Sequence, residues 1–153
     1  MTRLAAPMEE VRKVVLIEFT PAQMFDLVEN IEAYPEYLPW CSAAEVFSRT
    51  ATHTSARIHA SYHGMGASIA TENDNERPAK ITLKLREGPF RRFEGEWKFS
   101  PLGDSACKVE LRIAYEFASR IVGKAIEPVF QHISNSLVDA FIKRAEQIYG
   151  PRQ

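Results

Sequence analysis

The chain has 153 residues, which suffices for one domain with a sizeable core and is short for two. A formal net charge of -1 excludes a broad basic field for nucleic acid, and 45% hydrophobic with 25% charged residues is ordinary for a globular protein. Two cysteines without a CxxC pair exclude a disulfide framework, and no apolar run reaches the ~18 residues of a membrane span. The N-terminus also lacks the basic start and apolar run of a signal peptide, so we expect a cytoplasmic protein.

The first regular elements are a strand and a short helix. Residues 11–19 are rich in β-branched side chains and predict a strand. Thr20 and Gln23 have the spacing of a capping box, and Pro21 suits the first helical position. The buried side of this helix is expected to consist of Met24, Phe25, Leu27, Val28 and Ile31.

The segment that follows, Tyr34–Cys41 (YPEYLPWC), is the most informative in the chain. Its two prolines disfavour a regular helix or a central strand, and the residues before Pro35 and Pro39 are expected to be extended. We therefore predict a stiff, irregular loop with three large aromatic side chains. Such a loop must pack on the domain core, on a bound apolar ligand or on a partner.

Strands dominate the middle of the chain, where apolar and polar residues alternate with a period of two. The predicted strands cover about 43–50, 56–63, 67–72, 81–86, 93–99 and 107–116. The expected turns and loops lie at Gly64–Gly66, Asn73–Pro78, Gly88–Pro89 and Pro101–Asp104. Because these connections are short, the strands should pair antiparallel.

One long amphipathic helix is predicted from Ser119 to Tyr149, ended by Gly150-Pro151. Pro128 inside the pattern predicts a kink or a broken first turn. The apolar stripe of this helix consists of Ile126, Phe130, Ile133, Leu137, Phe141 and Ile148.

This order of elements predicts an α+β fold in which a strongly twisted antiparallel sheet of about six to seven strands wraps around the C-terminal helix. We expect residues 1–10 to be a lead-in and residues 11–150 to form a single domain. Small residues on the inner face would leave a pocket between sheet and helix, with the Tyr34–Trp40 segment near its mouth. These small residues are Ala56, Ala60, Gly64, Gly66, Ala67 and Ala70.

Large side chains elsewhere are then expected to line this pocket and to bind a hydrophobic ligand. The candidates are Met24, Tyr34, Tyr37, Trp40, Tyr62, Trp97, Phe130 and Phe141. Arg144 lies within the apolar stripe of the last helix and is a candidate contact for the polar head of the ligand. A snorkelling side chain or a salt bridge at the helix end would also explain it.

No constellation of catalytic or metal-binding residues is recognisable. His59 and His63 lie four residues apart on a predicted strand, about 13 Å, which is too far to share a metal ion. Asp26 and Glu29 are expected at the helix surface, and His132 off the apolar stripe and solvated. We therefore assign neither catalytic nor metal-binding residues.

A second candidate surface consists of basic residues around the turn at 88–90. Arg86, Arg91, Arg92 and Lys98 could contact RNA phosphate or anionic lipid there, together with nearby phenylalanines. Glutamates at 87, 94 and 96 dilute the charge. We favour a solvated hairpin tip over a binding patch.

Several motifs resemble those of the coenzyme Q-binding START-like proteins, also called the polyketide cyclase/dehydrase-like family. The resemblance spans about residues 10–150, and the Tyr34–Cys41 run is its most specific part. The sequence departs from the family at Ile69-Ala70-Thr71, where an aromatic and a hydroxyl residue are expected. The other matching motifs are Leu27-Val28, Gly88-Pro89-Phe90, Gly95–Phe99, Cys107-Lys108-Val109, Phe130, Leu137–Phe141 and Arg144-Ala145.

This resemblance implies the helix-grip fold and three functions. The first is non-enzymatic binding of ubiquinone or a related isoprenoid lipid in support of respiratory quinone function, with no required cofactor. The second is that of the bacterial ribosome association toxins of this family, which bind the large ribosomal subunit and block subunit joining. The third is cyclase-type enzyme activity. The implied partners are a hydrophobic small molecule, the large ribosomal subunit and transiently a membrane surface, but not DNA.

Overall fold

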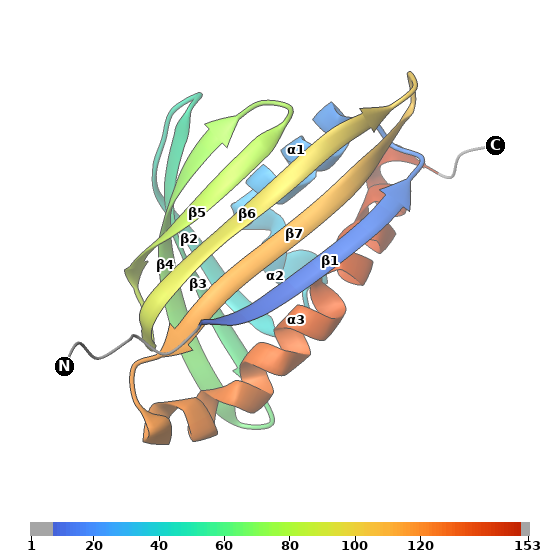
Figure 1. Cartoon of the computed structure of the whole chain (residues 1–153). Helices are drawn as coiled ribbons and strands as arrows, with labels where there is room; N and C mark the ends of the chain where they lie inside the picture. Colours follow the sequence, from blue (N-terminus) through green and yellow to red (C-terminus); the bar gives the residue numbers. More distant parts are fainter. Residues whose placement is uncertain (1–7, 151–153) are drawn as a thin grey trace.

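A curved antiparallel sheet embraces one long helix in the computed structural model of the chain, which describes residues 8–150 (Figure 1). The strands are β1 (Glu9–Ile17), β2 (Cys41–Arg49), β3 (His53–Tyr62), β4 (Met65–Glu76), β5 (Lys80–Glu87), β6 (Phe90–Leu102) and β7 (Ala106–Phe117). Within residues 8–150, these strands form one seven-stranded sheet in the order β1-β7-β6-β5-β4-β3-β2. The predicted α+β helix-grip fold is thus confirmed.

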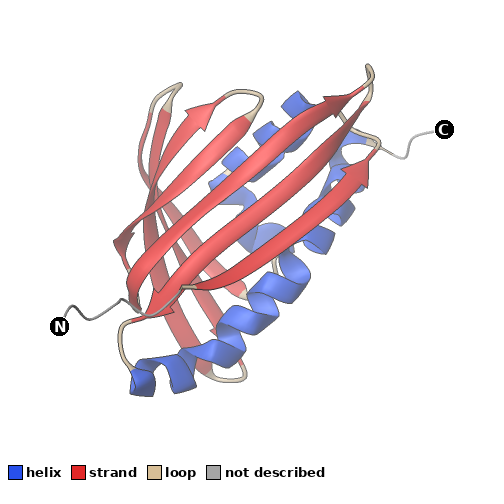
Figure 2. Ribbon diagram, in the orientation of Figure 1, coloured by secondary structure: helices blue, strands red, loops and turns tan. Residues whose placement is uncertain are grey.

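The helices all lie on the concave side of this sheet (Figure 2). They are α1 (Pro21–Glu29), the 3₁₀ turn η1 (Ile31–Ala33), α2 (Tyr34–Tyr37) and α3 (Arg120–Tyr149). The predicted capping box of α1 is present, with the Gln23 amide donating to Thr20 Oγ1 at 3.1 Å and the Thr20 amide donating to Gln23 Oε1 at 2.8 Å. These bonds satisfy amides that a helix start leaves without partners.

The Tyr34–Trp40 segment differs from the prediction of a wholly irregular loop. Tyr34 has φ -52° and ψ -43°, so it is helical although a proline follows it, and α2 forms one turn. Pro35 is tolerated because it lies in the first turn, where its missing N–H has no helical acceptor to lose. Leu38, before Pro39, is extended as predicted.

β4 is longer than predicted, and the correction matters for the site. The strand continues to Glu76, so Asn73 and Asn75 are strand residues and not part of a loop. Asparagine is uncommon in strands. Here pairing overrides that preference, because Asn73 lies opposite Thr54 of β3 and Leu83 of β5. The expected turn at 64–66 is shorter, because Gly66 already lies in β4.

The two ends of the domain also differ slightly from expectation. β1 begins at Glu9, so residues 9 and 10 belong to the sheet and not to the lead-in. Residues 1–7 of that lead-in lie outside the described part of the chain. α3 is continuous through Pro128, and its first turns run at an angle to the rest (Figure 1). Ile148, expected in the buried stripe, is 48% exposed, and Ala145 is buried there instead.

Phe141 of α3 joins the helix to the rest of the core. Its ring makes edge contacts with Tyr34, Tyr37 and Trp97 at centroid distances of 5.5, 5.8 and 5.4 Å. The side chain is 2% exposed. One aromatic ring thus connects the last helix, the α2 segment and the middle of the sheet.

We expect Phe141→Ala to lower the free energy of unfolding by about 3–5 kcal/mol, because it removes a buried ring and leaves a cavity. Ile121→Ala is the matched control in the same helix, since Ile121 is 82% exposed. It should change the value by less than about 0.5 kcal/mol. Urea titration followed by circular dichroism measures both. Equal effects of the two substitutions would contradict this account of the core.

Candidate functional site

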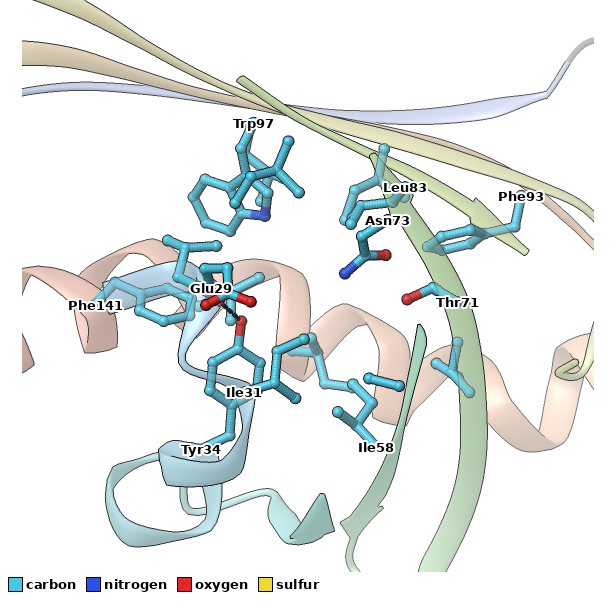
Figure 3. Close-up of a pocket in the computed structure, with 18 of the residues that line it drawn as sticks. Glu29, Ile31, Tyr34, Ile58, Thr71, Asn73, Leu83, Phe93, Trp97 and Phe141 are labelled. Atoms are coloured by element: carbon cyan, nitrogen blue, oxygen red, sulfur yellow. Dashed lines mark hydrogen bonds between the residues drawn. The ribbon is translucent and has the colours of Figure 1, made fainter. Parts of the chain in front are cut away.

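A cavity lies between the concave face of the sheet, α3 and the segment from α1 to β2 (Figure 3). It encloses about 890 Å³ when the solvent space at its mouth is included. Its wall is mostly aliphatic and aromatic, with side chains from β3, β4, β5, β6 and β7 facing those of α3. A mostly apolar wall with a few polar groups is typical of small-molecule sites.

Five of the nine predicted ligand-binding residues line this cavity. They are Tyr34, Trp40, Trp97, Phe130 and Phe141. Ala56 also lines it, alone among the small residues expected to create the space. The Tyr34 hydroxyl donates to the carbonyl of Val28, which anchors the α2 turn to α1. Burial raises the pKa of Tyr34 well above its ordinary value, so the phenol stays protonated.

Met24 and Tyr62, two other candidates, do not line the cavity. Met24 is 1% exposed and belongs to the packed core beside it. Tyr62 stacks on His132 of α3, with centroids 4.1 Å apart and planes 9° from parallel. His132 is consequently half-buried, and not solvated as predicted.

Tyr37 and Arg144 also lie away from the cavity wall. The Arg144 guanidinium lies over the Tyr37 ring, 4.8 Å from its centroid, and Nη2 is 3.8 Å from Glu36 Oε1. Arg144 therefore makes the local ion pair that the sequence left open as an alternative. In this arrangement it is not placed to hold a ligand head inside the cavity.

Polar side chains that the sequence patterns did not predict line one part of the cavity. Thr71, Asn73 and Asn75 alternate along β4 and all face inward, while Glu29 closes α1 nearby (Figure 3). Glu29 was expected at the helix surface, and its place on the wall corrects that expectation. The signal was available, because charged residues at 72, 74 and 76 alternate with uncharged ones at 71, 73 and 75.

A chain of hydrogen bonds connects this polar group. Asn75 Nδ2 donates to Thr54 Oγ1 at 3.0 Å, and the Thr54 hydroxyl donates to Glu29 Oε1 at 3.0 Å. Arg49 Nε donates to the same carboxylate oxygen at 2.6 Å and pairs with Glu32 as well. One oxygen of the Glu29 carboxylate, Oε1, thus accepts both bonds, and Arg49 and Thr54 hold it in place.

The remaining nucleophile and metal candidates are either buried or engaged. Both Cys41 and Cys107 are buried thiols. His59 Nε2 lies 3.1 Å from Glu45 on the outer face. Across residues 8–150, no three potential ligands gather in a geometry that would hold a metal ion.

The predicted basic residues do not form one patch, although Arg91 and Arg92 border a common hollow with Lys84. Arg86 lies over the Phe47 ring and bonds to Ser55, Arg92 pairs with Glu116, and Lys98 pairs with Glu96 farther along β6. Arg91, which donates to the carbonyl of Ala118, also borders a surface hollow at the start of α3. Arg120 and Lys124 border the same hollow, together with Glu116 and Glu127.

No helix among residues 8–150 combines the length and the apolar character that a membrane span requires.

Comparison with known proteins decides the family. The family model described as polyketide cyclase / dehydrase and lipid transport matches residues 17–142, most of the chain. The chain belongs to this family. The resemblance inferred from the Tyr34–Cys41 segment is therefore confirmed, and the family description covers both enzymes and lipid transport proteins.

Among curated relatives, the chain is 37% identical over 143 residues to the ribosome association toxin RatA of Vibrio cholerae, covering 94% of this chain and 99% of that protein. It is 30% identical over 145 residues to RatA of Escherichia coli K12, covering 95% and 92%. A more distant relative is the mitochondrial coenzyme Q-binding protein COQ10 homolog B of Xenopus laevis, 26% identical with 98% and 65% covered.

Solved structures share the fold at low identity. The Zhui aromatase/cyclase from Streptomyces sp. R1128 superposes with a TM-score of 0.80 at 16% identity, covering 92% of this chain and 94% of that one. A START superfamily protein from Mycobacterium smegmatis gives 0.76 at 19% identity, covering 91% and 98%.

The two thiols should resist alkylation in the native protein. Burial raises the pKa of Cys41, and raises that of Cys107 to about 11, so little reactive thiolate exists near pH 8. Iodoacetamide at about that pH should leave both cysteines unmodified in the native chain and modify both in urea, as measured by mass spectrometry. Rapid native labelling of Cys41 would instead indicate that the Trp40 region opens to solvent.

Proposed function

We propose that the protein binds an apolar ligand of the isoprenoid quinone class in the sheet–helix cavity and does not transform it. The observation that carries this proposal is a cavity with mainly hydrophobic walls, which include the five aromatic side chains predicted to line it. Each ~100 Å² of apolar surface buried there would contribute about 2.5 kcal/mol to binding. Such binding needs only a few polar contacts for orientation.

The comparisons support this proposal at two levels. The family description includes lipid transport, and a relative of 26% identity is named for coenzyme Q binding. The cavity itself argues against a cyclase-type reaction. The carboxylate on its wall, Glu29, is already bound by Arg49 and Thr54, and both thiols lie elsewhere. We infer a carrier that works in the cytoplasm, in transient contact with a membrane surface.

Two measurements test ligand binding directly. Native mass spectrometry and organic extraction of gently purified protein should reveal a co-purifying lipid or quinone. Added decyl-ubiquinone or decyl-ubiquinol should bind in equilibrium dialysis. The absence of any extracted lipid, combined with no binding of either form, would refute the proposal.

A substitution inside the cavity tests whether the ligand binds there. Ala56 is 3% exposed and lines the cavity, so Ala56→Leu places extra side chain in the ligand's space. We expect quinone affinity to fall at least about tenfold, equivalent to ~1.4 kcal/mol. Ala43→Leu is the matched control on β2, since Ala43 is exposed. Unchanged affinity in Ala56→Leu would place the ligand outside the cavity.

A second candidate function is association with the ribosome. Its support is specific, because two bacterial relatives that match 92–99% of their own length at 30–37% identity are named ribosome association toxins. The hollow bordered by Arg91, Arg120 and Lys124 is the surface we infer for contact with phosphate. The ligand cavity and this surface are formed by different residues, so the two functions are compatible.

The double substitution Arg91→Glu with Arg120→Glu should weaken co-sedimentation with large ribosomal subunits and reduce its dependence on salt, because phosphate contacts release counterions. Lys98→Glu with Lys143→Glu makes the same change in net charge at two other exposed positions and serves as the control. Equal co-sedimentation of both double variants with wild type would exclude this surface.

A further inference from the structure

We infer that the cavity selects the reduced, hydroquinone form of its ligand, because its polar part presents hydrogen-bond acceptors that a hydroxyl group can satisfy and a quinone carbonyl cannot. This inference rests on the proposed function and specifies the chemistry of the same site. Its evidence is a pair of asparagine side chains on β4 that have unfilled acceptors.

Asn73 and Asn75 carry the main observation. They are 6% and 5% exposed, and the Oδ1 atom of each is buried without a hydrogen-bond partner. A buried acceptor without a partner destabilises a folded protein, and native structures seldom retain one. Both side chains line the cavity, and the Asn73 amide is directed into it (Figure 3). A ligand that donates hydrogen bonds would satisfy both oxygens.

The hydrogen-bond chain at Asn75 fixes which end of its amide is free. Glu29 is paired with Arg49 and can only accept, so the single hydroxyl proton of Thr54 must go to Glu29. Thr54 Oγ1 must then accept from Asn75, which requires Nδ2 on that side. The other terminal atom of the Asn75 amide, which has no partner, is therefore the oxygen Oδ1. This acceptor can be satisfied only by a hydrogen-bond donor.

The spacing of the two asparagines suits a ring that carries two hydroxyl groups, as a hydroquinone does. Residues two apart on one face of a strand lie about 7 Å apart, so both acceptors border the same part of the cavity. The neighbouring wall consists of Leu83, Ile81 and Trp97, which offer a ring apolar surfaces to pack on. The apolar tail would then extend along the remainder of the cavity toward its mouth.

Trp40 distinguishes the two redox forms further. Its indole Nε1–H is also buried without a partner, and Trp40 lines the cavity. A quinone carbonyl can accept from this indole but can donate nothing to the asparagines. A hydroquinone oxygen can accept a hydrogen bond and also donate one. The reduced form therefore matches both kinds of unfilled group, and the oxidised form matches only one.

Three probes of similar shape test this inference in anaerobic equilibrium dialysis: decyl-ubiquinol, decyl-ubiquinone and the dimethyl ether of the quinol, which keeps the oxygens but lacks the donors. Wild type should bind the quinol about tenfold more tightly than either of the others, the effect of roughly one good hydrogen bond. Equal binding of all three, or tighter binding of the quinone, overturns the inference and leaves the proposed function intact. Failure of all three to bind overturns both.

Two substitutions then locate the selectivity. Asn73→Leu and Asn75→Leu should each lower the quinol-to-quinone affinity ratio, and the double variant should bring it close to one, while binding of the dimethyl ether persists. Asn135→Leu is the control, because Asn135 is exposed on α3. Asn73→Leu should also raise the thermal midpoint of the ligand-free protein, since it removes an unpaired buried acceptor. A lower midpoint together with an unchanged affinity ratio would show that Asn73 has only a structural role and overturn its assignment.

Discussion

The contact of Phe141 with three other aromatic rings is the constraint on which the rest of the structure depends. A sheet that curves around a helix must be held to that helix somewhere, and here Tyr34, Tyr37 and Trp97 converge on one phenylalanine. Because this contact joins α3 to the sheet on one side, the helix does not have to fill the whole concave face. The cavity is the space that remains beside it, and its aromatic wall includes three of these four rings.

The composition of the cavity indicates a compromise between stability and binding. A packed hydrophobic core avoids unsatisfied polar groups, yet this cavity keeps two amide oxygens and one indole N–H without partners among the described residues. Their neighbours Thr54 and Glu29 form a continuous hydrogen-bond chain with Arg49 on the surface. That chain holds Asn75 in one orientation. Polar groups without partners are common where a protein is organised to bind another molecule.

The same fold occurs in relatives with very different names. The distribution of residues in this chain suggests how one fold can serve different functions. Fold alone does not specify function, which depends on the particular groups on the cavity wall and on the outer surface. In this chain the inner wall is apolar with an asparagine pair, and the exposed start of α3 brings Arg91, Arg120 and Lys124 to one hollow. Ligand binding and association with a large partner would therefore depend on separate surfaces of one domain.

Local sequence patterns determined most of the fold. The period of two placed Trp97, Phe99 and Cys107 on the inner face, and the period of three to four gave α3 its buried stripe, because these repeats record which side of an element is buried. Trp97, Phe130 and Phe141 of the cavity wall followed from the same patterns, and Tyr34 and Trp40 from the aromatic segment before β2, whereas Phe93 was not predicted. The polar part did not, because asparagine usually marks a loop and only pairing with β3 and β5 made Asn73 and Asn75 a strand. Likewise, the ion pair of Arg144 with Glu36 joins side chains of different segments. The basic residues of the predicted patch are separated in the same way. Those relations depend on the register of the sheet and the position of the helix, which only the tertiary structure decided.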